Sequence, residues 1–397
     1  MQDPWGIRGL GIYDYSLCDA LYKKNKNLTL ITNCYYEYGE LSNFKVDKYF
    51  FKYSEKLKVG LFRNVIRGLE YCFNMLKLLK IYSKETPDII HIQWLLFYQF
   101  DYFWLRILKY RLHQKNTKII LTAHNVLPHI NGYKYKNILG KIYSQFDGII
   151  VHSDVLKEQM NEIFSEKVND CSICVIPLGT VTKLFEKIDK NVLNSYRRKI
   201  NVSKNKGRNF LFVGVIHKNK GLNVLLEAWI KHINKYPKDK LYIIGKPNYN
   251  MNNELQTIEK YHSSIFSSLE YKSDEELLAY YFECDFVVLP YLEASQSEVL
   301  LTALSLGKPV IATKVGAIPE VINIIKGGYI VEPNDPKQLC LAINKASEIS
   351  RDELIKWNED IKYKTIKYFS WDKIAELTYN FYEELFYDCN PKSPILI

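Results

Sequence analysis

Residues Cys284–Ile322 read CDFVVLPYLEASQSEVLLTALSLGKPVIATKVGAIPEVI, and this stretch decides the predicted fold. The short apolar run Phe286–Leu289 predicts a strand that is buried on both faces of a parallel sheet. A polar loop over 293–298 leads into a predicted helix, Val299–Leu306, which Gly307 ends. A loop between a parallel strand and a helix amino terminus points free backbone N–H groups at an anion. The stretch therefore predicts a site for a phosphorylated ligand.

The same strand–loop–helix pattern repeats through the second half of the chain. Helical segments alternate with short apolar runs that begin near residues 210, 241, 268, 286 and 309. A further run at 327–331 adds a sixth strand. Ser273, with Glu276 three residues on, predicts a capped helix start. This alternation predicts a parallel, doubly wound sheet.

A basic loop follows the first of these strands. The apolar run ends at Gly214, and His217, Lys218 and Lys220 come just before a predicted helix over 222–233. Two or three cations at a helix amino terminus could neutralise a diphosphate. The loop is not a P-loop, because no Ser or Thr follows the lysine. A solvated basic turn is the alternative interpretation.

Strand-like runs also alternate with helical segments in the first half of the chain. They cover residues 28–32, 89–93, 118–122, 148–152 and 172–176. This half therefore predicts a second doubly wound sheet.

The chain opens with a glycine-rich segment, Arg8-Gly9-Leu10-Gly11, which predicts a turn before a helix over 12–22. Gly9 and Gly11 would let the backbone approach a phosphate or sugar, although an ordinary tight turn fits equally well. Such a loop normally follows a buried strand, and only Met1 and Gln2 stand in that place. We therefore expect the first strand to be missing, either lost from this sequence or dispensable.

His124 is a candidate site residue of the first half. It follows the predicted strand 118–122. A polar side chain at the carboxyl end of a parallel strand faces the ligand crevice. His91, at another strand end, competes for this role, and a lone histidine is more often structural.

Two predicted helices, 57–82 and 97–112, mix aromatic, leucine and basic residues. Their cations could lie along an anionic bilayer surface while apolar side chains dip into it. The cations are Arg63, Arg67, Lys77, Lys80, Arg106, Lys109 and Arg111, and the apolar residues are Phe62, Phe73, Trp104 and Leu108. Burial in the core is the alternative for each apolar residue. For the region as a whole, we expect peripheral membrane contact.

Length and composition set further bounds. A chain of 397 residues suggests two domains. The 54 Lys and Arg against 44 Asp and Glu give a formal charge of +10, which favours anionic partners or serves solubility. The eight cysteines are scattered, and Cys171 with Cys174 lacks the second pair or histidines of a zinc site. Free thiols, no signal peptide and no apolar run of roughly 18–20 residues predict a cytoplasmic protein.

Taken together, these loops resemble family 4 of the retaining glycosyltransferases, nucleotide-sugar enzymes of the GT-B fold. The resemblance covers nearly the whole chain. It is carried by residues 8–11, 122–124, 175–179, 212–221, 273–277, 289–290, 303–312 and 316–320.

The resemblance implies an α/β protein with two doubly wound Rossmann-like domains facing across a cleft. Residues 1–182 would form the acceptor domain, and residues 183–367 the nucleotide-sugar domain. Residues 368–397 would form a closing helix that crosses back to the first domain, and a tail. Neither a cofactor nor a metal is expected, because the loops themselves would neutralise the phosphates and no carboxylate cluster suggests Mg²⁺.

The resemblance also implies roles for single residues. His124, Lys220 and Glu293 would act in catalysis. The donor would be bound by Gly9, Gly11, Gly214, His217, Lys218, Gln296, Ser297, Glu298 and Thr302.

Two positions depart from the family pattern. Val215 stands where the family usually has an arginine, so His217 or Lys218 must supply that charge. The family's two glutamates, eight positions apart, fall on Thr302 and on the residue after Glu293. Glu293 would then contact the donor-sugar hydroxyls, and Thr302 offers the ribose only a hydroxyl.

The implied function is transfer of a sugar, with retention, from a nucleotide-diphosphate sugar to a glycan or lipid-linked acceptor. Surface polysaccharide or glycolipid synthesis at the inner face of the membrane would be its setting. The departures at Val215 and Thr302 keep open a second class, a degenerate sugar-nucleotide-binding or scaffold subunit. A phosphorylase or epimerase of similar architecture is a third, although nothing resembles a cofactor-lysine site. Nucleic-acid binding would rest on net charge alone and is not expected.

Overall fold

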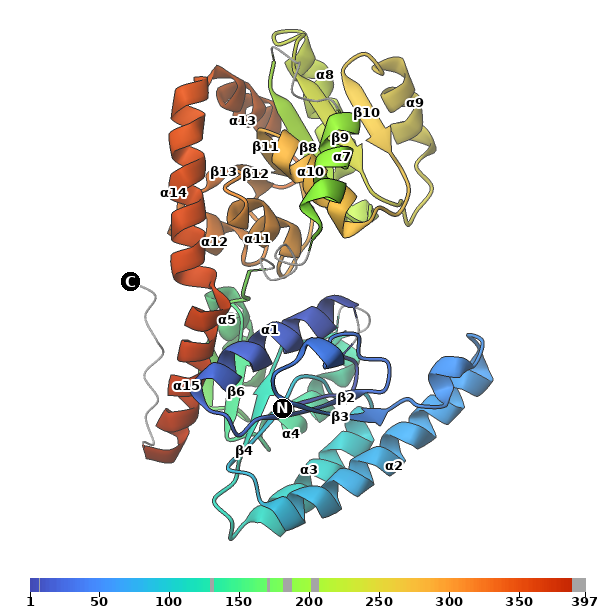
Figure 1. Ribbon diagram of the computed structural model, residues 1–397, viewed down its shortest axis with the longest axis vertical. Coiled ribbons are helices and arrows are strands. Elements are labelled where there is room, and N and C mark those ends of the chain that lie inside the picture. Colours follow the sequence, from blue (N-terminus) through green and yellow to red (C-terminus); the bar gives the residue numbers. More distant parts are fainter. Residues whose placement is uncertain (7, 129–131, 170–171, 181–187, 201–206, 388–397) are drawn as a thin grey trace. The chain divides into compact units, whose positions relative to one another are not determined.

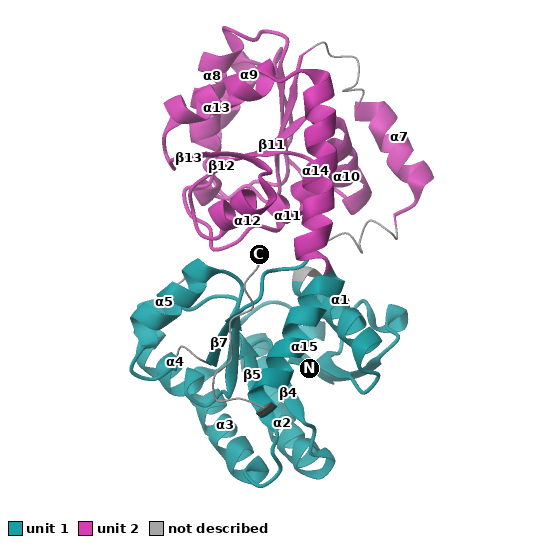
Figure 2. Ribbon diagram, turned by 90° about the vertical axis from the view of Figure 1, so that its left-hand side faces the viewer, with its two compact units in different colours: residues 1–179, 371–397 teal, residues 180–370 magenta. Residues whose placement is uncertain are grey.

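The computed structural model describes residues 1–6, 8–128, 132–169, 172–180, 188–200 and 207–387 (Figure 1). The chain divides into two compact units (Figure 2). Unit 1 comprises residues 1–179 and 371–397, and unit 2 comprises residues 180–370. The predicted tail, 388–397, lies outside the described residues, as does Cys171.

Unit 1 is built on a seven-stranded sheet in the order β3-β2-β1-β4-β5-β6-β7. All neighbouring strands in it pair in parallel. The strands are β1 (Gln2–Asp3), β2 (Thr29–Asn33), β3 (Lys45–Phe50), β4 (Ile89–Ile92), β5 (Lys118–Thr122), β6 (Gly148–Val151) and β7 (Ile173–Val175). The helices are α1 (Arg8–Lys24), α2 (Leu61–Glu85), α3 (Tyr98–Leu112), α4 (Lys136–Tyr143), α5 (Asp154–Phe164) and α15 (Trp371–Tyr387).

β1 corrects the expectation that the first strand is missing. Gln2 pairs with Ile31 of β2 on one side and with Ile92 of β4 on the other. Residues Gln2 and Asp3 therefore form a strand between β2 and β4, because backbone pairing holds β1 on both sides. β3 was not predicted, since its polar sequence KVDKYF lacks a buried-strand pattern and suits an edge strand.

The turn after β1 also differs from the prediction. It is made at Gly6, which has φ +29°, and a Cβ there would lie 1.9 Å from Thr32 Oγ1. α1 already begins at Arg8, so Gly9 and Gly11 lie within its first turns and not in a loop before it. The glycine that the turn requires is Gly6.

Helices cover both faces of the unit 1 sheet (Figure 1). Ile119 and Leu121 of β5 belong to the core formed with α2, α3, α4 and α5. Ile120, between them, belongs to the core formed with α1 and α15. Successive side chains of a strand point to opposite faces, so each face of β5 serves a different layer.

Two predicted membrane contacts of α3 are wrong. Trp104 and Leu108 are buried in the core of unit 1. The Trp104 indole N–H donates to a backbone carbonyl of α2 at 2.6 Å, which satisfies its one polar group. Arg63 and Arg67 are not free for lipid either, because both pair with the carboxylate of Glu55.

Unit 2 has a six-stranded parallel sheet in the order β10-β9-β8-β11-β12-β13. The strands are β8 (Asn209–Val213), β9 (Lys240–Ile244), β10 (Ile265–Ser268), β11 (Phe286–Leu289), β12 (Val310–Thr313) and β13 (Gly328–Val331). The helices are α7 (Lys190–Ile200), α8 (Leu222–Ile233), α9 (Asn252–Lys260), α10 (Asp274–Glu283), α11 (Glu298–Ser305), α12 (Ile318–Ile325), α13 (Pro336–Glu348) and α14 (Arg351–Phe369).

The stretch 284–322 folds as predicted, into strand, loop, helix, strand, loop and helix. β11 is fully buried, as a central parallel strand should be. Gly307, with φ +71°, follows the end of α11. Ser273 caps α10 by accepting the Glu276 N–H at 3.3 Å, which confirms the predicted helix start. Both doubly wound sheets expected from the sequence are therefore present.

Candidate functional site

The strand order of unit 2 reverses between β8 and its neighbour β11. In an open α/β sheet, ligands bind outside the carboxyl ends of the strands at such a point. The loops leaving these two strands span residues 214–221 and 290–297. They carry the predicted residues Lys220 and Ser297, so the topology brings the two predicted loops together.

Backbone contacts hold these two loops against each other. The Leu292 N–H donates to the Asn219 carbonyl at 2.8 Å. The Asn219 side-chain amide donates to the Glu293 carbonyl at 3.3 Å. Gly221 has φ +67°, and a Cβ there would lie 1.9 Å from the carbonyl oxygen of Pro290. Only glycine allows this approach, so the geometry of the crevice is built into the backbone.

Lys220 places a cation in this crevice. Its Nζ lies 3.6 Å from the ring centroid of Tyr291, a buried residue at the start of the second loop. Burial lowers the pKa of the Lys220 ammonium to about 8, and the carboxylate of Glu298 opposes that shift. The ammonium is therefore mostly charged at neutral pH, and it loses its charge as the pH rises past this pKa.

The amino end of α11 lies at the end of the second loop. Ser297 caps the helix by accepting the Leu300 N–H at 3.2 Å. The loop is held from the other side by Gly316, whose φ is +51° and whose Cβ would lie 2.0 Å from the Ala294 carbonyl. The free N–H groups of the first turn are thus fixed in position, as an anion site requires.

The other predicted residues of the first loop differ in exposure, and Gly214 is half-buried. Gly214 has φ +113°, and a Cβ on Gly245 would lie 1.9 Å from the Gly214 carbonyl oxygen. His217 and Lys218 both lie on the surface. The His217 ring is held by Asn248, whose amide nitrogen lies 3.1 Å from Nδ1. The loop after β9 therefore supports the basic loop after β8.

Three residues of the second loop and α11 differ in what they can offer a ligand. Glu293 is exposed, and Gln296 is half-buried. Thr302 donates its hydroxyl to the Glu298 carbonyl at 2.8 Å. Its oxygen can then only accept a hydrogen bond from a ribose. Val215, in the position that would hold an arginine, is 53% exposed.

Unit 1 also gathers polar side chains at the carboxyl edge of its sheet. Gln93, His124 and His152 follow the neighbouring strands β4, β5 and β6. His124 Nε2 lies 3.2 Å from Gln93 Oε1, and His124 Nδ1 lies 3.1 Å from His152 Nε2. His152 Nδ1 lies 2.9 Å from the Ile176 carbonyl oxygen. The predicted residue His124 is thus the middle member of a hydrogen-bonded row.

The end of this row fixes the tautomers. A carbonyl only accepts, so His152 Nδ1 carries a hydrogen and donates to Ile176. Neutral His152 then accepts at Nε2 from the Nδ1–H of His124. Neutral His124 is left with a lone pair on Nε2, beside the amide of Gln93. The nitrogen of the same amide lies 3.3 Å from His91 Nε2, so Gln93 stands between His91 and His124.

Burial keeps the row neutral. It lowers the pKa of His124 well below its ordinary value and that of His152 to about 4. The His124 ring stacks on Trp94, with centroids 5.0 Å apart and an interplanar angle of 5°. The edge of Tyr13 meets it at 5.2 Å. His124 is therefore held as a neutral, oriented ring and not as a free base.

His91, the competing candidate, has a different environment. It is 2% exposed, and burial lowers its pKa to about 3. Its Nδ1 lies 2.5 Å from the Tyr382 hydroxyl of α15, and its Nε2 lies 2.7 Å from Thr122 Oγ1. These contacts join α15 to the sheet, so His91 has a structural environment, whereas His124 is half-buried.

The predicted donor-binding role of Gly9 and Gly11 rests on a loop that the structure does not form. Both residues belong to α1. A Cβ on Gly11 would lie 3.0 Å from the Gly6 carbonyl oxygen, so Gly11 lets the turn after β1 pack on the helix. This packing gives Gly11 a structural reason to be glycine.

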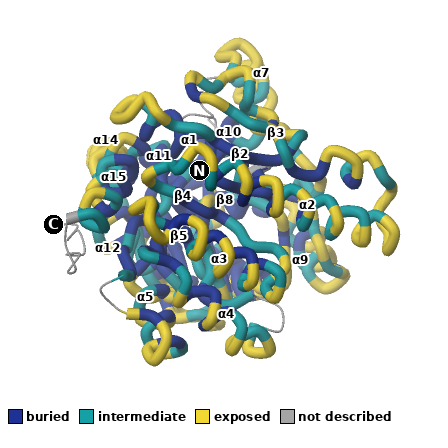
Figure 3. Tube along the Cα trace, turned by 90° about the horizontal axis from the view of Figure 1, so that it is seen from below, coloured by how far each residue is buried: buried dark blue, intermediate teal, exposed yellow. Residues whose placement is uncertain are grey.

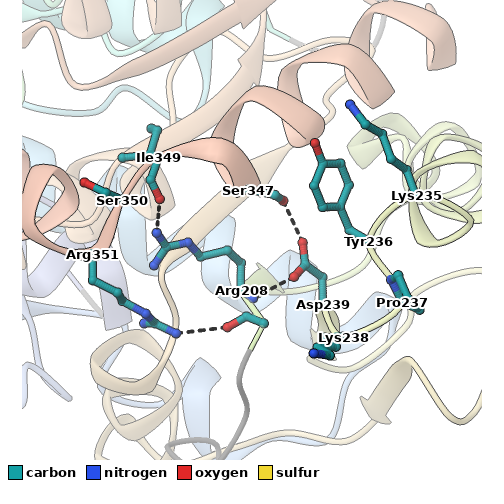
Figure 4. Close-up of a pocket in the computed structure, with 11 residues that line it drawn as sticks. Arg208, Lys235, Tyr236, Pro237, Lys238, Asp239, Ser347, Ile349, Ser350 and Arg351 are labelled. Carbon is teal, nitrogen blue, oxygen red and sulfur yellow. Dashed lines mark hydrogen bonds between the residues drawn. The ribbon is translucent and has the colours of Figure 1, made fainter.

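A pocket of about 470 Å³ lies at the opposite edge of the unit 2 sheet (Figure 4). It is lined by residues just before β8 and β9, by the end of α13 and by the start of α14: Gly207, Arg208, Lys235, Tyr236, Pro237, Lys238, Asp239, Ser347, Ile349, Ser350 and Arg351. Asp239 accepts the Arg208 N–H at 2.7 Å and the Ser347 hydroxyl at 2.6 Å. The Asp239 carboxylate is thus engaged by a backbone N–H group and a hydroxyl, and the pocket does not lie at the carboxyl ends of the strands, where the ligand crevice is expected.

Two further observations bear on the site and its surroundings. Within the described ranges, no cluster of three His, Cys, Asp or Glu side chains is placed to hold a metal ion. Across the same residues, no helix combines the length and apolarity needed to cross a bilayer.

Sequence reasoning missed two residues of these clusters. His152 follows β6 as His124 follows β5, so the repeated strand-then-histidine pattern could have indicated it. Tyr291 follows Pro290 directly after β11, but its contact with Lys220 depends on how the two loops fold together.

Comparisons with known proteins agree with this architecture. Residues 7–184 match the model described as Glycosyltransferase Family 4, and residues 207–348 match Glycosyl transferases group 1. The D-inositol 3-phosphate glycosyltransferase of Corynebacterium jeikeium is 28% identical over 252 residues, which are 62% of this chain and 59% of that enzyme. The lipopolysaccharide 1,2-N-acetylglucosaminetransferase of Salmonella typhimurium is 23% identical over 67% of each chain.

A solved structure extends the comparison to the whole fold. The Anabaena protein HepE in complex with UDP-glucose has a TM-score of 0.67 with this chain at 15% identity, covering 97% of this chain and 98% of that one. By its two family matches and its fold, the chain belongs to the GT-B glycosyltransferases.

Proposed function

We propose that this chain transfers a sugar, with retention, from a nucleotide-diphosphate sugar to a glycan or lipid-linked acceptor. The observation that carries this is the crevice between β8 and β11. There Lys220 and the amino end of α11 come from two loops that are bonded to each other. A cation and fixed N–H dipoles are the groups that a leaving diphosphate needs.

In this reaction the bond between the anomeric carbon and the donor phosphate oxygen breaks, and a bond to the acceptor oxygen forms. Negative charge develops on the departing diphosphate. Lys220, aided by Lys218 or His217, would stabilise that charge together with the N–H groups of Gln296, Ser297 and Glu298. The acceptor proton would pass to the departing phosphate oxygen, so no separate base is needed.

The other predicted residues take supporting roles in this proposal. Glu293, exposed beside the crevice, would accept hydrogen bonds from donor-sugar hydroxyls. Thr302 would accept one bond from the ribose. His124 would line the acceptor side as a neutral ring, because both of its nitrogens face protein groups. No metal or cofactor takes part in this proposal.

The acceptor and setting are proposed on chemical grounds. The Salmonella relative is named for lipopolysaccharide, a glycan that carries a lipid. We propose a comparable acceptor here, for polysaccharide or glycolipid synthesis on the cytoplasmic side of a membrane. Contact with that membrane would be peripheral.

The direct test is to incubate the protein with UDP- and GDP-sugars and acceptor extracts, and to measure nucleotide release. Release is expected with at least one donor, and Lys220→Ala should lower it strongly. The anomeric configuration of the product, read by NMR, tests retention. A folded protein that neither binds nor turns over any donor would contradict the proposal.

One observation favours a second candidate, a sugar-nucleotide-binding subunit without transferase activity. Val215 leaves an exposed apolar side chain where a second fixed cation would strengthen the diphosphate site. Donor binding without nucleotide release, unchanged on addition of acceptors, would support this candidate.

A further inference from the structure

α2 exposes a row of large apolar side chains over four turns. Its members recur every three or four residues, which places them on one side of the helix. This α2 row consists of Phe62, Val65, Leu69, Phe73 and Leu76, with exposed fractions of 71, 54, 66, 70 and 52%. Figure 3 shows exposed positions running along this helix. The opposite side of α2 is buried in the core, so the row is not needed for folding.

α3 continues this surface. α2 and α3 lie side by side (Figure 1). Both bury one side in the same core of unit 1, so their other sides face away from the sheet together. On that side α3 exposes Phe103, Ile107 and Tyr110, which are spaced at four and three residues. Large apolar surfaces that remain uncovered are uncommon on soluble monomers and often mark interaction sites.

Cations accompany the apolar side chains. Lys80 and Lys84 are exposed and extend the α2 row by one and two turns toward its carboxyl end. Lys77 is exposed beside them, and Arg106 is exposed between Phe103 and Tyr110 on α3.

Three carboxylates near the row are engaged elsewhere. Glu55 pairs with the two arginines of α2. Glu70 accepts the backbone N–H groups of Tyr53 and Ser54, each at 2.8 Å. Asp101 is buried and bonds to the Tyr71 hydroxyl at 2.8 Å. The surface that α2 and α3 present is therefore positive as well as apolar.

A groove of about 650 Å³ borders the α2 row. It lies between α2 and the edge strand β3, and Phe73, Lys48, Lys52 and Lys77 are among the residues that line it. Asp47, also in the lining, pairs with Lys45 at 2.9 Å. The groove thus adds cations directly beside an exposed aromatic ring.

We propose that this α2–α3 surface docks the protein on an anionic lipid bilayer. The apolar row would sit at the boundary between headgroups and acyl chains, and the lysines and Arg106 would pair with lipid phosphates. A second copy of the chain fits this surface less well, because a symmetric contact would bring like charges together. The inference rests on the proposed function in one respect: a lipid-linked acceptor would lie in the same bilayer on which the protein docks.

The test is flotation of the full chain with vesicles, measured without donor or acceptor, so that its failure is distinct from failure of sugar transfer. Vesicles of phosphatidylcholine alone are compared with vesicles containing phosphatidylglycerol. The protein is expected to partition onto the anionic vesicles and to be released by salt. Absence of partition onto the anionic vesicles would overturn the proposal.

Two variants test the two components separately. Leu69→Glu with Phe73→Glu should lower partition roughly tenfold or more, because apolar insertion is lost. Lys80→Glu with Lys84→Glu should lower it by roughly fivefold for each lysine removed, or more. Tyr271→Glu, at a residue of unit 2 that is 82% exposed, is the matched control and should partition like the parent.

Circular dichroism and light scattering complete the design. If Leu69→Glu with Phe73→Glu does not fold, the lysine variant, which changes only exposed side chains, carries the test. Folded variants that partition like the parent would overturn the proposal. Light scattering also tests for a dimer of the parent protein. A dimer that dissociates when Leu69→Glu and Phe73→Glu are introduced would overturn the proposal, since the surface would then be an interface between copies.

Discussion

Lys220 Nζ lies 3.6 Å from the ring centroid of Tyr291, and the two residues come from loops that leave neighbouring strands of unit 2. The ring holds the ammonium at the point where the strand order reverses. The ring leaves the charge of the ammonium available to a ligand, since a tyrosine ring carries no net charge. The same burial lowers the pKa of Lys220 to about 8.

Donor binding should therefore weaken above pH 8. The ammonium is present below its pKa and lost above it, so about nine tenths of the charge is gone at pH 9. UDP binding measured by calorimetry between pH 7 and 9.5 should follow this titration. Lys220→Arg should bind UDP with little pH dependence, because a guanidinium stays charged. An equally steep loss in Lys220→Arg would contradict the assignment.

Tyr291 should contribute to donor binding through its ring and not its hydroxyl. Tyr291→Leu removes the cation–π contact, worth roughly 0.5–2 kcal/mol, and should weaken UDP binding by a few-fold up to about thirtyfold. Tyr291→Phe keeps the ring and is the matched control. Equal losses in the two variants, measured by the same calorimetry, would show that the ring is not what matters.

His152 should act on transfer through the orientation of His124. His152→Ala leaves the Nδ1–H of His124 without its acceptor at 3.1 Å, so the ring is free to turn. Transfer should fall roughly 10- to 100-fold, as for other losses of positioning, with UDP binding unchanged. His152→Gln can donate to the Ile176 carbonyl and accept from His124, and should restore most of the rate. If His152→Gln transfers sugar as slowly as His152→Ala, His152 has only a packing role and does not orient His124.

Acid should destabilise unit 1 through its buried histidines. The pKa of His91 is lowered to about 3 and that of His152 to about 4, whereas both titrate near 6.5 when unfolded. Below pH 6.5 the unfolded chain binds protons that the folded chain does not. The free energy of unfolding should fall by up to about 1.4 kcal/mol per pH unit for each histidine. Urea denaturation at pH 7, 6 and 5 measures the slope, and His152→Gln should make it shallower.

Gly245→Ala should destabilise unit 2. The residue has φ +140°, and the new Cβ would lie 1.9 Å from the Gly214 carbonyl oxygen. The cost should be about 3 kcal/mol or more, because backbone cannot yield as a side chain can. Gly60→Ala is the control, since a Cβ there meets nothing within 4 Å, and should cost less than about 1 kcal/mol. Similar urea midpoints for the two variants would contradict this account.

Both parallel sheets and most of the loops that carry the candidate site could be predicted from local sequence patterns. A run such as Phe286–Leu289 is buried on both faces and can be little else than a central strand. Gly307 and Ser273 mark helix ends through local backbone and capping chemistry. These signals act over a few neighbouring residues, so they can be recognised in the sequence without knowledge of the tertiary structure. The resemblance of the loops to a known family added roles for the candidate residues.

Which of those residues contact one another follows from the packing of the folded chain. β1 is two residues long, and its pairing with β2 and β4, not its own sequence, makes it a strand. Trp104 faces the core while Phe103 faces solvent, and composition alone treats them alike. His124 contacts His152, which lies 28 residues further along the chain. Lys220 contacts Tyr291, which belongs to a different loop. Such contacts depend on strand order, which is set by the burial of whole helices and sheets and not by any local pattern.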